Sequence, residues 1–465
     1  MIAPLYRNQK GSALPVVFIF AAVGTIAASV YLVGQTVSSR QRLGAPAAQQ
    51  ALLNARSGIW YALDLLYDTL AADTLPTVNP LDTLFGKELF GSASGAPVEP
   101  AGDRKLSPDG TPRELVPYTS DEFGFCEIAL HFTGAFKQVV SRGFFSVQER
   151  AVEALIGGEA VVSAETLLYL PDAATPVGNL LPSVRIGTFN VAKEINNGQL
   201  QELIGYYVSQ LTYDSSAGLF EAPLVIQNQA ALEKLSETVE GPLLVDGMFW
   251  DLVWKADKSY RILGDLQLTG KVRVERCDFL VAGDIKVLDD VTMKNVTMFA
   301  TGQIFIGDRA VFSGDAMALS KMTVYGNARA ENRSTLIVAG RKSGGPPKTD
   351  RKETKKGGTI ADHFGILLSE SAVVDGVVMA LQSPGGIKVD EDVLVTGVLF
   401  AQRLLCLRGT VAGVVKAGLP RDCSDPDFMK NPASIPGTLK SLPSIRQYRF
   451  PCILGKPAII SWKED

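Results

Sequence analysis

Histidine is almost absent from this chain, with two residues among 465. Because histidine is the commonest metal ligand and general base, its scarcity argues against zinc sites and catalytic triads. The sequence contains no Cys–His metal spacing, no glycine-rich phosphate loop and no Ser–His–Asp set, so no cofactor is expected. The formal net charge of −4 gives no electrostatic reason to expect nucleic acid as a partner.

Cysteine is also sparse, with five residues spread too widely for a disulfide framework. Cys406, Cys423 and Cys452 lie late enough in the chain to include one bridge, which an oxidising compartment would permit. The alternative is that each is a small buried hydrophobic residue. The sequence leaves this pairing open.

Glycine and proline are abundant by contrast, at 44 and 25 residues, and they predict many turns. Hydrophobic residues make up 46% of the chain and charged residues 20%, as in a folded protein. A chain of 465 residues is expected to form roughly two to four structural units.

The first long apolar run covers residues 12–34, which contain no charged side chain. At ~1.5 Å rise per residue, a helix of this length reaches about 35 Å, enough to cross a hydrocarbon core of ~30 Å. We therefore predict a transmembrane helix over 12–34, preceded by a basic leader over 1–11. Basic residues flank the run on both sides, so they do not fix its orientation.

The leader ends in Lys10-Gly11 and is followed at once by Ser12-Ala13-Leu14. This junction resembles the amino terminus of type IV pilin-like proteins, most closely the minor pilins and pseudopilins that initiate or cap a filament. The resemblance implies cleavage by prepilin peptidase after Gly11, with Ser12 as the first mature residue. It also implies other pilin-like subunits as partners through the N-terminal helix. The major subunits carry glutamate at the fifth mature position, where this chain has Val16, a departure shared by some tip-type minor members.

Other interpretations of the apolar run stay open. A plain signal anchor has the same pattern, and a cleaved secretory signal peptide is a third reading, although no clear small-x-small site closes the segment. The pilin-like interpretation predicts a single pass through the inner membrane, a cytoplasmic N-terminus, and the bulk of the chain in the periplasm or outside the cell.

A small α+β head resembling that of the pilins is predicted next. Apolar residues at three-, four- and seven-residue spacing predict an amphipathic helix over 47–71 with one buried face. Core packing is the expected use of this stripe, and a partner helix in a filament is the alternative. Residues 72–120 are rich in proline and glycine and read as a loop or linker. Within the head over 121–240, alternation over 125–132 predicts a strand that returns as a hairpin.

From residue 241 the pattern changes to short apolar runs separated by Gly, Asp and Asn turns. Similar short sequences recur at a spacing of nineteen residues in three places, as shown by Gly283 and Gly302, Met298 and Met317, and Met379 and Val398. This period suits one coil of a parallel β-helix, in which stacked coils build a continuous core. We predict a β-solenoid over 241–418, with roughly eight coils forming a rod of about 40 Å at ~4.8 Å per rung.

Two segments do not follow this nineteen-residue repeat. The charged, glycine- and proline-rich stretch over 341–358 is expected to be a flexible insertion between coils, and the proline-rich tail over 419–465 is expected to cap the rod. A leucine-rich repeat fits less well because its asparagine and leucine scaffold is missing. The sequence of a β-sandwich would not repeat the same short segment at a fixed interval.

Parallel β-helices also carry polysaccharide lyases and hydrolases, whose sites need acid and base groups on one face. Five aspartates cluster in this part of the sequence: Asp284, Asp289, Asp290, Asp308 and Asp315. Most sit beside glycine, asparagine or another aspartate, which favours turn formation over catalysis. A β-helix carbohydrate-active enzyme remains an alternative. A self-polymerising scaffold is another, because the small apolar coils resemble those of bactofilins.

The sequence thus predicts a mixed fold with an N-terminal transmembrane α-helix, a small α+β pilin-like head and a C-terminal parallel β-helix. The predicted function is that of a non-enzymatic, membrane-anchored envelope protein. It would be a minor pilin-like component of a type IV pilus or a type II secretion pseudopilus, presenting the solenoid as a spacer or adhesive surface. A cell surface or polysaccharide is the ligand considered for the solenoid, with no cofactor and no metal.

Overall fold

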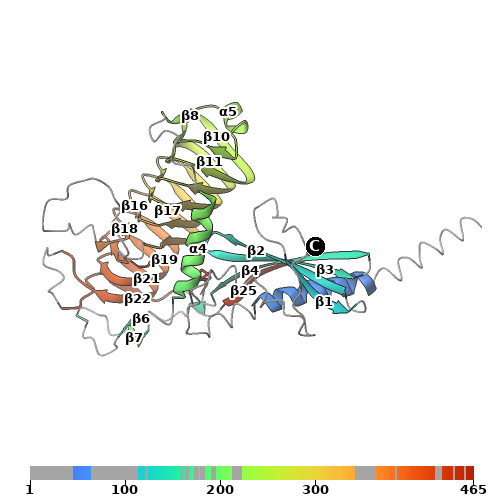
Figure 1. Ribbon diagram of the computed structural model, residues 1–465. Helices are drawn as coiled ribbons and strands as arrows, with labels where there is room; N and C mark the ends of the chain where they lie inside the picture. The colour runs from blue at the N-terminus through green and yellow to red at the C-terminus, as the bar shows by residue number, and fades with distance from the viewer. Residues whose placement is uncertain are drawn as a thin grey trace, which may run out of the picture.

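The computed structural model describes residues 46–63, 114–120, 124–145, 147–158, 161–162, 167–171, 177–178, 184–189, 195–211, 222–340, 363–382, 385–424, 432–442, 446–454 and 457–464. These residues form two modules side by side (Figure 1). One is an antiparallel sheet with a helix lying on it, which we call the sheet module. The other is a rod of parallel strands.

The sheet module combines the helix over residues 46–63 with five strands in the order β1–β2–β3–β4–β25. Its strands are β1 (Glu114–Ser120), β2 (Gly124–Thr133), β3 (Phe136–Phe145), β4 (Gln148–Gly158) and β25 (Pro457–Glu464). The predicted hairpin is confirmed, because β2 and β3 pair antiparallel through a turn at Gly134, where φ is 58°. β25 comes from the far end of the chain and pairs with β4.

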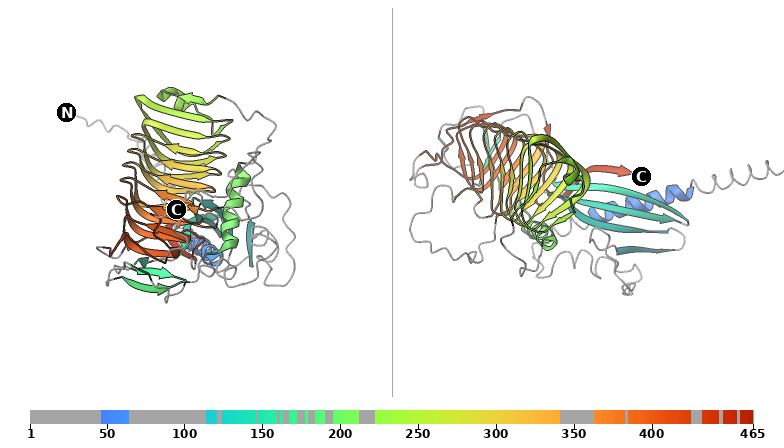
Figure 2. Two further views of the ribbon diagram at one scale, coloured as in Figure 1. Left: turned by 90° about the vertical axis from the view of Figure 1, so that its left-hand side faces the viewer. Right: turned by 90° about the horizontal axis from the view of Figure 1, so that it is seen from above.

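The rod is a β-solenoid, which confirms the parallel β-helix predicted from the sequence (Figures 1 and 2). Most coils contribute a segment to each of three parallel ladders, and the longer strands bend from one ladder to the next. In chain order the strands are β8 (Leu224–Ile226), β9 (Thr238–Val239), β10 (Leu243–Ile262), β11 (Leu266–Val281), β12 (Ile285–Val287), β13 (Thr292–Ala300), β14 (Gln303–Ile306), β15 (Val311–Ala318), β16 (Lys321–Val324), β17 (Arg329–Val338), β18 (Ile366–Leu368), β19 (Val373–Ala380), β20 (Ile387–Val389), β21 (Leu394–Leu407), β22 (Thr410–Pro420) and β23 (Thr438–Lys440).

Apolar side chains stacked in register fill the rod. Along the first ladder, each coil places a residue of similar size directly over that of the coil before. The buried column consists of Leu243, Leu266, Ile285, Ile304, Met322, Ile366, Ile387 and Leu405. A single coil could not remove these side chains from water, so the stack of coils supplies the stability.

Coil length varies around the predicted nineteen residues. The N–H of Gly302 donates to the carbonyl of Gly283 at 3.1 Å, so this predicted pair does stack. Met317, however, pairs with Phe299 and not with Met298, because the register shifts at Asn295, whose φ is 51°. Such a bulge changes the number of residues between stacked positions without interrupting the ladder.

Both ends of the rod carry additional elements. The short helix α5 (Gln229–Glu233) lies at the end that begins with β8, and its Leu232 is buried in the core of the rod. At the other end, β6 (Leu167–Leu170) pairs with β22, and β7 (Arg185–Thr188) pairs with β6. β23 joins the same end through a second ladder of β22. The strands β5 (Val161–Val162) and β24 (Arg446–Gln447) form a small two-stranded sheet of their own.

The helix α4 (Asn197–Gln210) runs beside the rod and packs between part of it and the sheet module (Figures 1 and 2). It begins after Asn196, whose side chain accepts the N–H of Gln199 at 3.0 Å. This is the usual arrangement of an N-cap. Its buried residues include Leu200, Leu203 and Tyr207.

The predicted transmembrane helix requires correction. None of the helices in the described part of the chain is both long and apolar enough to cross a membrane. The helices α4 and α5, with 14 and 5 residues, are too short to cross a membrane. The helix over residues 46–63 buries only one face, whereas a membrane span is apolar all round. The predicted span over 12–34 lies outside the described residues. Across the described residues the fold is mainly a β-solenoid with few helices and no membrane-spanning one, which contradicts the predicted fold class and the predicted single-pass place in the inner membrane.

Candidate functional site

The helix over residues 46–63 and the sheet touch backbone to backbone. A Cβ added at Gly143 of β3 would lie 1.9 Å from the carbonyl oxygen of Ala51. A Cβ added at Gly58 would lie 2.2 Å from the hydroxyl oxygen of Ser141. At Gly143, where the neighbouring atoms belong to the helix backbone, glycine is therefore required for the helix to lie this close.

One face of this helix belongs to the core of the sheet module. Ile59 and Leu63 are buried against a cluster that includes Val139 and Ile156. The predicted core packing of the apolar stripe is thus confirmed for the part of the helix that is described. The opposite face carries Trp60, whose side chain is 58% exposed.

The last strand fixes the exposed side of the helix. Arg56 donates two hydrogen bonds of 2.8 Å to the carboxylate of Glu464, a paired geometry that orients both side chains. These bonds lower the pKa of Glu464. Trp60 lies beside Trp462, with ring centroids 6.4 Å apart. The helix therefore depends on a strand from the opposite end of the chain.

An apolar column on the outside of the rod joins it to α4 and the sheet module. From β11 to β21, the outward-pointing residues at one register position of the third ladder are buried: Leu280, Phe299, Met317, Ile337, Met379 and Phe400. The ring of Tyr207 stacks on Phe299 with centroids 4.7 Å apart, and its hydroxyl donates to the carbonyl of Gly134 at 2.8 Å. One tyrosine of α4 thus contacts both the rod and the turn between β2 and β3.

Sequence reasoning missed this junction, although a signal was present. The segments 279–281, 298–300 and 336–338 are each apolar at three successive positions. A strand with one solvated face alternates, whereas a strand covered on both faces is apolar throughout. These runs therefore indicated that the third ladder is covered on its outer side as well.

A polar column borders the same junction. Asp278, Thr297, Asp315 and Thr335 occupy one register position on successive coils. Asp315 lies against the turn at Gly134, since a Cβ added there would be 2.9 Å from its side chain. Removal from water raises the pKa of Asp315 to about 6. This carboxylate titrates where the sheet module meets the rod.

The predicted turn aspartates occupy the corners of the coils. Asp265 accepts the N–H of Asp284 at 2.8 Å, and Asp284 in turn accepts the N–H of Gln303 at 2.7 Å. Each carboxylate therefore links its coil to the next one. Asp289 and Asp308 have φ of 59° and 58°, in the left-handed region that aspartate tolerates.

Asp290 and Asp315 complete the predicted set. Asp290 pairs with Arg309 of the next coil at 2.6 Å, so it also links successive coils. The predicted turn role is thus confirmed for four of the five aspartates, whereas Asp315 lies within β15. Within the described residues, no group of three or more His, Cys, Asp or Glu side chains could hold a metal ion.

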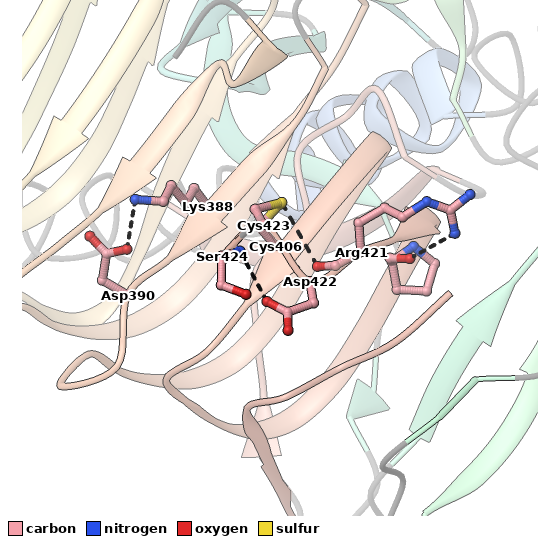
Figure 3. Close-up of a disulfide and its surroundings, with 8 residues drawn as sticks. Lys388, Asp390, Cys406, Arg421, Asp422, Cys423 and Ser424 are labelled. Carbon is pink, nitrogen blue, oxygen red and sulfur yellow. Dashed lines mark hydrogen bonds and ion pairs between the residues drawn. A yellow bond between two sulfur atoms is a disulfide. The ribbon is translucent and has the colours of Figure 1, made fainter. Parts of the chain in front are cut away.

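One disulfide joins the last coils of the rod (Figure 3). Cys406 of β21 and Cys423 are bonded, with their Cα atoms 5.7 Å apart. Cys452 is buried and free, and burial raises the pKa of its thiol to about 12. Of the three cysteines that the sequence left open, the first two therefore form the bridge.

Two predicted features lie outside the described residues. These are the cleavage site at Gly11 and Ser12, and the insertion over 341–358. The coils on either side of the insertion remain in register, since Met322 of β16 pairs with Ile366 of β18. The insertion thus interrupts the sequence of the solenoid without interrupting its ladder.

Comparison with known proteins gives little further information. No family model matches the sequence, and no curated protein matches it. Among solved structures, the crystal structure of the competence-associated pilin ComZ from Thermus thermophilus is similar at 10% identity. The match covers 90% of this chain and 97% of that one, with a TM-score of 0.17. A TM-score this low carries no argument.

Proposed function

We propose that this chain is a non-enzymatic, pilin-like filament component. The sheet module assembles with other pilin-like subunits and displays the β-solenoid beside it. The observation that carries the proposal is the helix over residues 46–63, which lies on an antiparallel sheet with glycines at the contact. The resemblance to pilins implies this arrangement, in which an N-terminal helix continues into the head and packs under a sheet.

The finer proposal is a minor subunit of a type IV pilus or of a type II secretion pseudopilus. The resemblance of the Lys10-Gly11 junction to the minor pilins supports it, with prepilin peptidase cutting after Gly11. The size of the rod supports it too, because about 40 Å of stacked coils at ~4.8 Å per rung stands beside each sheet module. A filament in which every subunit carried such a rod would be crowded.

The exposed face of the helix is the surface proposed to meet neighbouring subunits. Leu53 and Trp60 are seven residues apart on one face, and both are exposed. Large apolar residues that are exposed together on one face are a candidate contact surface. We therefore expect Trp60→Ala to reduce recovery of the chain in the sheared filament fraction.

Mass spectrometry of the amino terminus in the native cells tests the proposal. With prepilin peptidase present, we expect a mature chain that begins at Ser12; without the enzyme, we expect one that begins at Met1. Gly11→Val should block cleavage and remove the chain from the sheared filament fraction, whereas Ser12→Ala is the matched control and should be cut normally. A chain that keeps Met1 in cells with active peptidase contradicts the proposal.

Two alternatives from the sequence receive less support. A self-polymerising scaffold needs open coil ends, whereas α5 covers one end and β6, β7 and β23 extend the other. A β-helix enzyme needs carboxylates that are free to act, whereas Asp284, Asp289 and Asp290 are engaged in bonds between coils. The Cys406–Cys423 bridge fits a protein that folds in an oxidising compartment, as an exported filament component would.

A further inference from the structure

The first full coil of the solenoid is longer than its successor. Leu243 pairs with Leu266, whereas Leu266 pairs with Ile285 nineteen residues later. Most of the extra residues fall between Gly247 and Leu252, where the register of β10 against β11 shifts. They form a corner of β10, which lies near the end of the rod that is remote from the sheet module (Figure 1).

This corner holds three large apolar residues in water. Met248, Phe249 and Trp250 are 69%, 74% and 69% exposed. In a regular strand alternate side chains would point inward, but here all three point outward. Six of the eleven exposed large hydrophobic residues in the described part of the chain gather at this end: Leu224, Val225, Met248, Phe249, Trp250 and Val253. Folding of the chain gives no reason for this placement.

Hydrogen bonds hold the base of the corner. Asp246 accepts the N–H of Met248 at 2.9 Å and the side-chain amide of Gln227 at 3.0 Å. On the other side, Gln229 accepts the N–H of Val253 and donates to its carbonyl, both at 2.9 Å. The three apolar side chains are thus presented from a fixed base, which lowers the entropy lost on binding.

We propose that the ridge formed by Met248, Phe249 and Trp250 binds the pyranose rings of an uncharged polysaccharide. Exposed aromatic rings stack on the apolar C–H face of a sugar, and the neighbouring carboxylate of Asp251 accepts its hydroxyl hydrogens. The proposal rests on the proposed function, in that the sheet module holds this end of the rod outward. It adds the class of ligand and the residues that contact it.

The size of the ridge favours a sugar over a second protein. A fully exposed aromatic side chain offers about 150–250 Å², so the three residues together offer roughly 400 Å². Each partner in a stable protein interface buries about 800 Å². The ridge is therefore too small to hold a second copy of the chain but is large enough for two or three sugar rings.

Charge favours a neutral sugar over a lipid surface or an acidic polymer. Carboxylates flank the ridge on both sides, at Asp246 and Asp251. They would repel the negative surface of a bilayer rich in anionic lipid. Sugar hydroxyls, by contrast, donate hydrogen bonds to carboxylates. An uncharged, hydroxyl-rich chain is thus the ligand that suits both the rings and the acids.

Titration of the purified full chain with three oligosaccharides tests this site. The probes are cellohexaose, chitohexaose and mannohexaose, followed by tryptophan fluorescence and calorimetry. We expect saturable binding of at least one probe and a loss of affinity of at least tenfold in Phe249→Ala/Trp250→Ala. Trp250→Phe keeps a ring and should bind within about threefold of the natural chain. Trp60→Ala is the matched control, an exposed tryptophan on the other module, and should bind normally.

Several outcomes would overturn the site. One is the absence of saturable binding to all three sugars, and another is unchanged binding by the double variant. A third is a double variant that binds the sugars as the natural chain does but no longer binds phosphatidylglycerol vesicles, or no longer self-associates. Thermal unfolding of the double variant should match that of the natural chain, because the replaced side chains lie in water.

The two proposals fail separately. Normal processing at Gly11 without sugar binding overturns the ridge alone. Sugar binding without processing overturns the filament role alone.

Discussion

Lys137 of β3 and Glu202 of α4 form an ion pair that is fully enclosed by the protein. Their nitrogen and oxygen lie 3.0 Å apart, and each side chain is 1% exposed. The ammonium also lies 5.2 Å from the centre of the Phe132 ring. Removing two charges from water is unfavourable unless each satisfies the other. The pair therefore fixes the position of α4 on the sheet module.

Removing one partner of this pair should be strongly destabilising. We expect Lys137→Met or Glu202→Gln to lower the free energy of unfolding by about 3–5 kcal/mol, because the remaining polar group stays buried without its partner. Lys137→Met/Glu202→Leu should recover most of this loss, since no charge is then left unpaired. Urea unfolding followed by circular dichroism measures each value. A double variant as unstable as the single variants would contradict the explanation.

Replacing Gly143 should separate the helix from the sheet. The added Cβ of Gly143→Ala has no space beside the backbone of Ala51, so the helix over residues 46–63 must shift. We expect a loss of about 2 kcal/mol or more in stability and, on the proposed function, reduced recovery of the chain in the filament fraction. Urea unfolding and immunoblots of sheared filaments measure the two effects.

Gly205→Ala is the matched control for this change. Gly205 lies in the middle of α4 with no atom within 4 Å of an added Cβ. Alanine is favoured over glycine inside a helix by roughly 0.5–1 kcal/mol. We therefore expect Gly205→Ala to be neutral or stabilising, and a loss equal to that of Gly143→Ala would show that the contact with Ala51 is not the cause.

The junction between rod and sheet module should weaken as pH rises. The pKa of Asp315 is raised from 3.8 to about 6 in the folded chain, so the folded state binds more protons than the unfolded state between these values. Stability should therefore fall as pH rises through this window and level off above it. The shift corresponds to at most about 3 kcal/mol.

Asp315→Asn should remove this contribution. We expect the midpoint of thermal unfolding of the natural chain to fall between pH 5 and pH 7.5 by more than that of the variant. Asp308→Asn, a change at an exposed corner, should leave the pH dependence as it is in the natural chain. Equal pH dependence in the natural chain and in Asp315→Asn would disprove the role of this carboxylate.

Reduction should destabilise the last coils of the solenoid. The Cys406–Cys423 bridge spans 17 residues, and closing a loop of this size stabilises by about 3 kcal/mol in the chain-entropy model. We expect dithiothreitol to lower the unfolding midpoint of the natural chain but not that of Cys406→Ser/Cys423→Ser. Cys452→Ser, at a free cysteine, should respond to the reductant as the natural chain does.

The solenoid could be predicted from the sequence because its repeat is visible within a few tens of residues. Stacked coils repeat the same inward residues, so the return of Gly283 at Gly302 is visible without a structure. The exact register of the strands could not be predicted from the sequence. A single residue with positive φ, Asn295, shifts the pairing of β13 and β15, so that Met317 lies beside Phe299 and not beside Met298. The turn aspartates were predictable for the same local reason, since short polar side chains suit corners.

Long-range pairings could not be predicted in this way. Nothing in the residues near Lys137 identifies Glu202 as its partner, because the contact depends on how α4 lies over the sheet. The same holds for Arg56 and Glu464, which meet across almost the whole length of the chain. Asp315 resembled the corner aspartates in sequence, and only the packing of the turn at Gly134 distinguishes it.

The order of strands has a consequence for biosynthesis. β25, which closes the sheet against β4, leaves the ribosome long after β4, while the helix that it holds through Arg56 is among the first described elements to emerge. β6 and β7 are likewise made well before β22, the strand they join. Neither module can reach its final form before these later strands are made, so a nascent chain must wait with an open sheet edge at β4 until β25 has emerged.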